Sequence, residues 1–178
     1  MDYKWYIEII NSNIIEQGDL IIDCPIIIPP PKIEEGDEPE IEIREVNSII
    51  LSQTCDLINN KIEIVLVCPY YNLKEFIDNT PENQKSKKAI DKNIDNLKKG
   101  HLPGYHLLNK NLELNINDYL VVDFRNVYGV EINNLRSIAE RNNHRIRLLP
   151  PYREHLSQSF ARYFMRVGLP QDILIEGY

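Results

Sequence analysis

Short apolar runs recur along the whole chain, separated by polar breaks or by Gly and Pro. Most of these runs are rich in β-branched and aromatic residues, a composition that is typical of strands. The pattern predicts strands at Leu20–Ile22, Val46–Ser52, Ile62–Cys68, Gly104–Leu108, Tyr119–Val127 and Ile146–Leu149. Pro25 should end the first strand, because proline cannot donate a ladder hydrogen bond. The polar stretch Asp56–Lys61 should join the second and third strands as a hairpin.

Other segments place apolar residues at helical spacing. Leu73–Lys99 predicts a surface helix that ends before Gly100, and Glu131–Arg141 predicts a short helix. Tyr3–Glu16 also predicts a helix, although its weak spacing fits an edge strand equally well. A final helix is predicted over 152–167, where the apolar stripe consists of Leu156, Phe160, Tyr163, Phe164 and Val167.

The length and composition favour one domain that covers residues 1–178. A chain of 178 residues with 43% hydrophobic content is long and apolar enough to bury a core. Pro, Glu and Asp dominate the loop 29–42, which cannot pack in that core. We therefore predict a mainly β fold with helices, with an acidic Pro-rich loop at 29–42, a helical insertion at 76–99 and a C-terminal amphipathic helix.

Several classes of protein do not fit the composition. No apolar run approaches the roughly 20 residues that cross a bilayer, and charged residues interrupt the start where a signal peptide would need an apolar stretch. The three cysteines form no Cys-x-x-Cys pair, which argues against a disulfide framework or a structural zinc site. We expect a cytoplasmic protein that has reduced thiols, no membrane contact, no bound metal and no cofactor.

The net charge of −7 is distributed unevenly along the chain. Residues 1–43 carry eleven acids against two lysines, whereas residues 135–166 carry seven arginines against two glutamates. Arginine suits bidentate contacts with phosphate or carboxylate groups. The arginines therefore indicate an anion-binding face, or ion pairs between the two ends of the chain, or a solvated surface.

Four short sequence segments resemble strands of the MazF/PemK-type toxins of bacterial toxin–antitoxin systems. Gln17–Ile21 is similar to the opening Gly-Asp strand of that family, and Ile49–Ser52 to its apolar strand that ends in Ser. Ile64–Pro69 resembles the next strand, which ends in Pro, and Leu120–Val127 resembles a later strand that leads into a short helix. The resemblance implies a small Src-homology-3-like barrel with a terminal helix, and it leaves 76–99 as an insertion.

The residues that the family uses to cleave RNA are missing at the matching positions. The family has an arginine just before the second strand, where this chain has Val46 and Asn47 with Arg44 out of register. It has Thr or Ser after the Pro of the third strand, where this chain has Tyr70 and Tyr71. The resemblance therefore implies a toxin- or defence-system component with lost or altered ribonuclease chemistry, and it does not identify an enzyme.

Two further strings, Leu51–Leu57 and Pro151–Leu156, are similar to strings in a family of small bacterial proteins. That resemblance supplies no activity.

One candidate reaction centre lies at the end of the second strand. Cys55 is the candidate nucleophile, with Asp56 beside it and His106 as the candidate base that would ionise the thiol. This arrangement would make a Cys55-dependent hydrolase. The alternative is that Cys55 is a small buried residue and Asp56 a turn former.

Candidate phosphate contacts lie mainly in the last third of the chain. His155, Ser159, Arg162 and Arg166 share one helix face by the three-and-four rule. That face could bind phosphate oxygens, the acidic loop, a partner's carboxylates or only water. Tyr70 and Tyr71 could form a platform on which bases stack. The candidate nucleic-acid or phosphate contacts are therefore Arg125, Arg153, His155, Arg162, Arg166, Tyr70 and Tyr71.

The leading hypothesis is therefore a barrel protein that binds nucleic acid or another phosphate ligand. The main alternative is a non-catalytic protein–protein interaction module. The candidate partners are RNA or DNA, another protein and a second copy of the chain.

Overall fold

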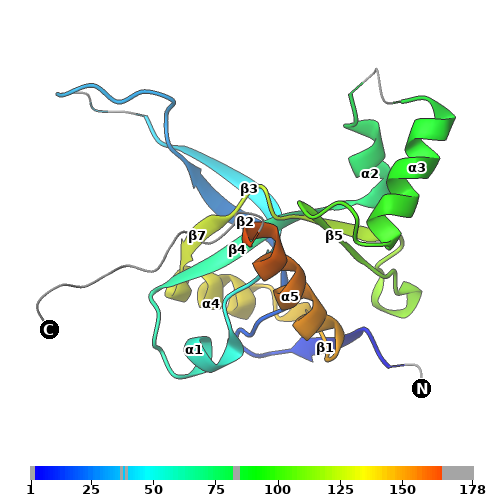
Figure 1. Ribbon diagram of the computed structural model, residues 1–178. Coiled ribbons are helices and arrows are strands. Elements are labelled where there is room, and N and C mark those ends of the chain that lie inside the picture. Colours follow the sequence, from blue (N-terminus) through cyan, green and yellow to red (C-terminus); the bar gives the residue numbers. More distant parts are fainter. Residues whose placement is uncertain (1–2, 37, 39, 82–84, 166–178) are drawn as a thin grey trace, which may run out of the picture.

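Eight strands form one antiparallel sheet in the computed structural model, which describes residues 3–36, 38, 40–81 and 85–165 (Figure 1). The strand order is β1-β8-β2-β3-β4-β6-β5, and β7 pairs with β4 beside this path. The strands are β1 (Tyr6–Ile10), β2 (Asp19–Ile28), β3 (Glu42–Ile50), β4 (Ile64–Asn72), β5 (Tyr105–Leu108), β6 (Leu120–Asp123), β7 (Tyr128–Glu131) and β8 (His144–Leu148). The helices are α1 (Thr54–Ile58), α2 (Leu73–Asp78), α3 (Lys87–Lys98), α4 (Ile132–Arg141) and α5 (Tyr152–Phe164), and a 3-10 turn covers Leu112–Leu114. The prediction of a mainly β fold with helices is confirmed.

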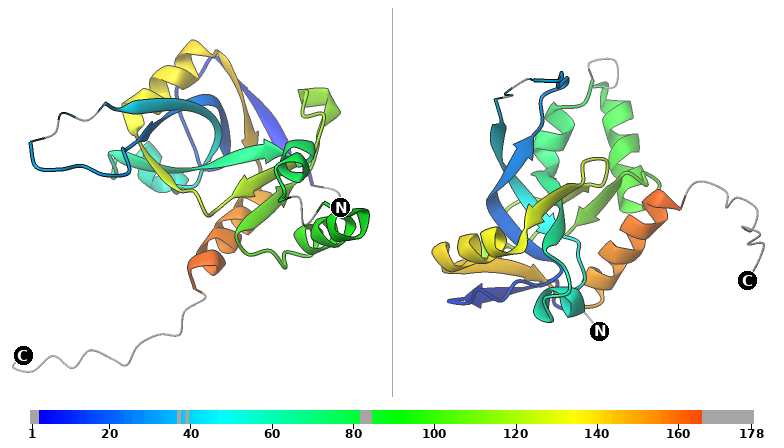
Figure 2. Two further views of the ribbon diagram at one scale, coloured as in Figure 1. Left: turned by 90° about the horizontal axis from the view of Figure 1, so that it is seen from above. Right: turned by 90° about the vertical axis from the view of Figure 1, so that its left-hand side faces the viewer.

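The sheet has helices on both faces, and each face has its own core cluster. Ile132, Leu135 and Ile138 of α4 pack on one face against Ile21, Val65 and Val67. Leu156 of α5 packs on the other face, with Leu20, Ile49 and Val122. Neighbouring residues of one strand point to opposite faces, so Leu20 and Ile21 belong to different clusters. Figure 2 shows α4 and α5 on opposite sides of the sheet.

The predicted helix over Tyr3–Glu16 is wrong, and the alternative of an edge strand is right. Residues Tyr6–Ile10 form β1 at one end of the sheet, paired only with β8. Tyr6 is the one buried residue of this strand, and its hydroxyl donates a hydrogen bond to the carbonyl oxygen of Asn109 at 2.6 Å. A segment that buries one side chain shows no clear apolar pattern. Its periodicity therefore does not distinguish a strand from a helix.

Pro25 does not end the first predicted strand, because β2 continues to Ile28. Beyond Leu20, β2 pairs with β3 alone among the described residues, which leave its other edge open. A proline is tolerated on an open edge, where its missing N–H leaves no neighbour unpaired. The hairpin of β2 and β3 extends away from the rest of the sheet (Figure 1).

The predicted strand Tyr119–Val127 is shorter in the structure, where it consists of β6 followed by a turn. β6 ends at Asp123, whose carboxylate Oδ1 accepts a hydrogen bond from the backbone N–H of Arg125 at 3.0 Å. This side-chain contact forms a turn, and the chain re-enters the sheet as β7 on β4. The sequence analysis predicts no strand over Tyr128–Glu131 and places Glu131 at the start of the following helix.

The predicted helices at the end of the chain are present with shifted limits. Glu131 is the N-cap of α4, since its side chain accepts a hydrogen bond from the N–H of Asn134. α5 begins at Tyr152 and ends at Phe164, whereas Val167 and Arg166 lie outside the described residues. The surface helix is two helices, α2 and α3, and Gly100 follows the second with a φ of +66°.

The second and third predicted strands, now β3 and β4, are antiparallel neighbours, with Ile49 opposite Cys68. The short helix α1 lies in the connection between them, so this is not a tight hairpin. Within the described residues no strand pairing joins β1 to β5, so the sheet is not closed. None of the helices in this part of the chain is both long and apolar enough to cross a bilayer.

Candidate functional site

A pocket of 380 Å³ opens between β5, α5 and the end of α3, and we call it the α5–β5 pocket. His155, Ser159 and Arg162, which the sequence places on one face of the last helix, all line it. His106 reaches the same pocket from β5. The structure therefore brings together three of the predicted site residues, His106, His155 and Arg162.

His106 is the most enclosed polar group of this pocket. Only 7% of the residue is exposed, and no described residue forms a hydrogen bond with its ring. Its ring centroid lies 5.0 Å from that of His155, edge to face. Burial, with a smaller contribution from His155, lowers the pKa of His106 to about 4. His106 is therefore a neutral ring that can accept or donate a hydrogen bond near neutral pH.

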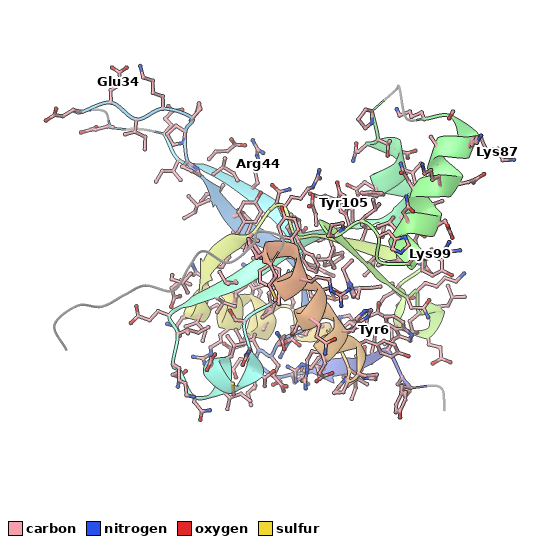
Figure 3. The ribbon with its side chains drawn as sticks, in the orientation of Figure 1. Tyr6, Glu34, Arg44, Lys87, Lys99 and Tyr105 are labelled. Carbon is pink, nitrogen blue, oxygen red and sulfur yellow. The ribbon has the colours of Figure 1, made fainter. Side chains whose placement is uncertain are left out.

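Three cationic residues line the same pocket as this imidazole pair. Arg162 is exposed, and it forms no ion pair or hydrogen bond in the described part of the chain. Lys98 of the last turn of α3 and the C-cap residue Lys99 also line the pocket, and Lys99 Nζ lies 2.6 Å from Asp95 Oδ2. Figure 3 labels Lys99 at the lower end of α3, where this helix meets the sheet. A cation that has no carboxylate partner is available to an external anion.

The rim of the pocket is aromatic. Trp5 stacks on Tyr152, with ring centroids 3.6 Å apart and an interplanar angle of 10°. Tyr105 and Tyr119 also line the pocket, and Lys110 Nζ lies 5.7 Å from the ring centroid of Tyr119. Trp5, Tyr119, Lys98 and Lys99 are not among the predicted site residues. For the two lysines the sequence does carry a signal, because the lysine-rich face of the predicted surface helix suits a solubilising surface or, alternatively, nucleic-acid contact.

Arg125 and Tyr71 line a second pocket, of 590 Å³, which shares Tyr105 with the α5–β5 pocket. Asp123 holds Arg125 by two contacts, Nε to Oδ1 at 2.9 Å and Nη2 to Oδ2 at 2.8 Å. These hydrogen bonds to Asp123 raise the pKa of Arg125 further above its usual range, so it stays cationic. The Arg125 guanidinium carbon lies 4.5 Å from the Tyr105 ring centroid. We call this the insertion pocket, because α2 and α3 supply one wall.

Tyr70 and Tyr71 do not form one stacking platform. They are neighbours in β4 and point to opposite faces. Tyr70 packs against the α5-side core, and burial raises its pKa to about 12. Tyr71 alone faces the insertion pocket, and burial raises its pKa as well.

Some arginines of the last third of the chain form ion pairs inside the protein. Arg145 and Arg147 both contact the fully buried Asp19, with Arg145 Nε 2.7 Å from Oδ2. Arg147 also pairs with Glu16, and Arg153 Nη1 lies 3.7 Å from Glu16 Oε2. The alternative of ion pairs between the two ends of the chain is therefore right for these three arginines. Arg153, a candidate phosphate contact, also pairs with Glu154.

Cys55 and His106 are not brought together. Cys55 is exposed on α1, and its Sγ lies 3.6 Å from Gln53 Oε1 and 3.7 Å from Asp56 Oδ1. α1 and β5 are on separate sides of the molecule (Figure 1). In the described part of the chain the thiol therefore has no histidine beside it that would act as a base.

Comparison of the sequence with known proteins does not decide between these sites. No protein-family model matches the chain, and no curated protein matches it either. The functional argument therefore rests on the residues of the two pockets.

Proposed function

We propose that this protein binds single-stranded nucleic acid through its phosphate groups at the α5–β5 pocket. The observation that carries the proposal is Arg162, which pairs with no described residue and lines the same pocket as the His106–His155 pair. Phosphate oxygens are strong acceptors for a guanidinium and for imidazole N–H groups.

The aromatic rim favours a single strand over a duplex. Proteins that bind single strands combine a basic groove with aromatic side chains on which bases stack. Trp5, Tyr105 and Tyr119 supply such surfaces beside the cations. A pocket of 380 Å³ is small for a duplex and suits part of one strand.

We also propose that the sheet is an open relative of the MazF/PemK-type barrel with lost or altered ribonuclease chemistry. The supporting observation is the antiparallel order β2-β3-β4, followed later by α5 on the core. This proposal concerns the fold, and the binding proposal does not depend on it.

Titration of labelled single-stranded RNA and DNA tests the binding proposal. We expect affinity that falls steeply between about 50 mM and 200 mM salt, because phosphate contacts release counterions. Arg162→Gln should weaken binding and reduce the salt slope by about one. Arg141→Gln on α4, on the other side of the sheet, is the matched control and should change neither.

The same samples, run on a denaturing gel, test for cleavage. Cut RNA would add an activity to the binding site, and intact RNA would leave a binding protein. Failure of both RNA and DNA to bind at low salt would reject the proposal.

A second candidate function, a protein-interaction module, is favoured by the projecting hairpin of β2 and β3. Ile27, Ile41 and Ile43 are 63%, 64% and 64% exposed. Ile27 and Ile43 are cross-strand partners, so they lie on one face. Contiguous exposed apolar side chains commonly mark interaction surfaces.

Sedimentation velocity over a range of concentrations tests whether the partner is a second copy of the chain. A dimer that Ile43→Lys dissociates would support this function. A monomer at every concentration would reject self-association through the hairpin.

A further inference from the structure

The insertion pocket adjoins the proposed phosphate site. Tyr105 lines both pockets. A single strand with a phosphate beside Arg162 would extend past this shared residue, so that a neighbouring base enters the insertion pocket. Figure 3 shows Tyr105 where the sheet meets α2 and α3.

Planar side chains form part of the wall of this pocket, and contacts with neighbouring side chains hold them in place. Phe76 of α2 contacts the Tyr105 ring edge to face, with centroids 4.9 Å apart. Arg125 lies over the same ring, and its bidentate contact with Asp123 fixes the guanidinium plane. Unstacked bases bind to aromatic rings and to guanidinium planes in this way.

The polar groups of the pocket also suit a base. The side-chain amides of Asn79 and Asn93 form no hydrogen bond with any described residue. Each amide offers a donor and an acceptor, which matches the edge of a base.

Asp123 is not available to a metal ion. Its Oδ1 accepts hydrogen bonds from Arg125, and its Oδ2 accepts from Arg125 and from Asn126 at 3.1 Å. The pocket therefore presents neutral amides rather than a free carboxylate.

We propose that the insertion pocket receives and reads one unstacked nucleobase, with Asn93 and Asn79 as the hydrogen-bonding residues. This inference rests on the proposed binding of single strands at the α5–β5 pocket. It gives the segment 76–99 a role in specificity, because Phe76 of α2, Asn79 directly after α2 and Asn93 of α3 all belong to it.

The test compares RNA homopolymers of about ten nucleotides, made of A, C or U, at one salt concentration. Fluorescence anisotropy should give affinities that differ by about tenfold between the best and the worst base. Asn93→Ala should reduce this difference to about twofold while it leaves the salt slope unchanged. Asn96→Ala, on the same helix but outside both pockets, is the matched control and should keep the preference.

Asn79→Ala provides a second variant, since Asn79 is exposed after α2 and its removal disturbs no core contact. Equal affinities for the three homopolymers, or a preference that both Asn93→Ala and Asn79→Ala leave unchanged, would overturn this inference alone. Loss of all RNA and DNA binding in the wild-type protein would instead reject the proposed function on which it rests.

Discussion

His106 is a buried imidazole whose pKa is lowered by burial, and this has a consequence for stability. Its pKa is 6.5 when exposed and about 4 in the fold, so the unfolded chain binds more protons between these values. The stabilisation is therefore complete above about pH 6.5 and is lost as the pH falls towards 4. We expect the free energy of unfolding to fall by about 2 kcal/mol from this group between pH 7 and pH 5.

Urea unfolding of wild-type protein and of His106→Gln at these two pH values measures this contribution. The variant should lose less stability on acidification, by about the same 2 kcal/mol. His101→Gln, at an exposed position, should follow the wild type. Parallel pH profiles for His106→Gln and the wild type would contradict the assignment.

Asp19 is the residue on which the internal ion pairs depend. Asp19→Asn would leave Arg145 and Arg147 buried beside a neutral amide. We expect it to cost about 3 to 5 kcal/mol, measured by urea unfolding, because an uncompensated buried charge is strongly destabilising. Glu8→Gln, which removes an exposed carboxylate beside His144, should change stability by less than about 0.5 kcal/mol. A similar cost for both variants would show that burial of the network is unimportant.

At the scale of elements, the turn before β2 depends on Gly18. This residue has a φ of +84°, and a Cβ added there would lie 3.0 Å from Leu148 Cβ. Gly36 has a similar φ of +92° in the loop of the projecting hairpin, but a Cβ there would meet nothing within 4 Å. We expect Gly18→Ala to cost about 2 kcal/mol or more and Gly36→Ala about 1 kcal/mol or less. Thermal unfolding measures both, and equal shifts in Tm would show that crowding against β8 has no effect.

A helix or strand could be predicted from the sequence where it buries several side chains along one of its faces. α4 has four buried apolar residues at helical spacing, and α5 packs its stripe on the core, so periodicity found both. β1 and β7 each bury one side chain and were missed or ambiguous. Their place depends on β8 and β4, which are distant in sequence, and local propensity carries no information about such a partner.

At the scale of the whole molecule, α2 and α3 complete the two pockets without building the core. Neither core cluster contains a residue from these helices. We expect replacement of residues 74–99 by a flexible Gly-Ser linker to leave cooperative unfolding intact. Oligonucleotide affinity should fall by about tenfold, because Lys98 and Lys99 are removed and each cation releases a counterion.

Calorimetry and anisotropy on the same variant measure these two effects. Replacement of residues 31–36 by a similar linker is the control, since that loop lies outside both pockets, and it should keep full affinity. Unchanged affinity after removal of α2 and α3 would place the nucleic-acid site elsewhere.

The sequence by itself determined the mainly β fold with helices, the last two helices, most of the strands and the gathering of His155, Ser159 and Arg162 on one helix face. These follow from periodicities of a few residues, which local backbone geometry imposes. Only the tertiary structure decided which arginines are free. Arg145 and Arg147 reach Asp19 across more than 120 residues of sequence, whereas Arg162 lines the α5–β5 pocket with His106 and pairs with no described residue. Long-range pairing depends on which strands and helices meet, so a count of charges along the chain could not separate the arginines of the buried network from Arg162.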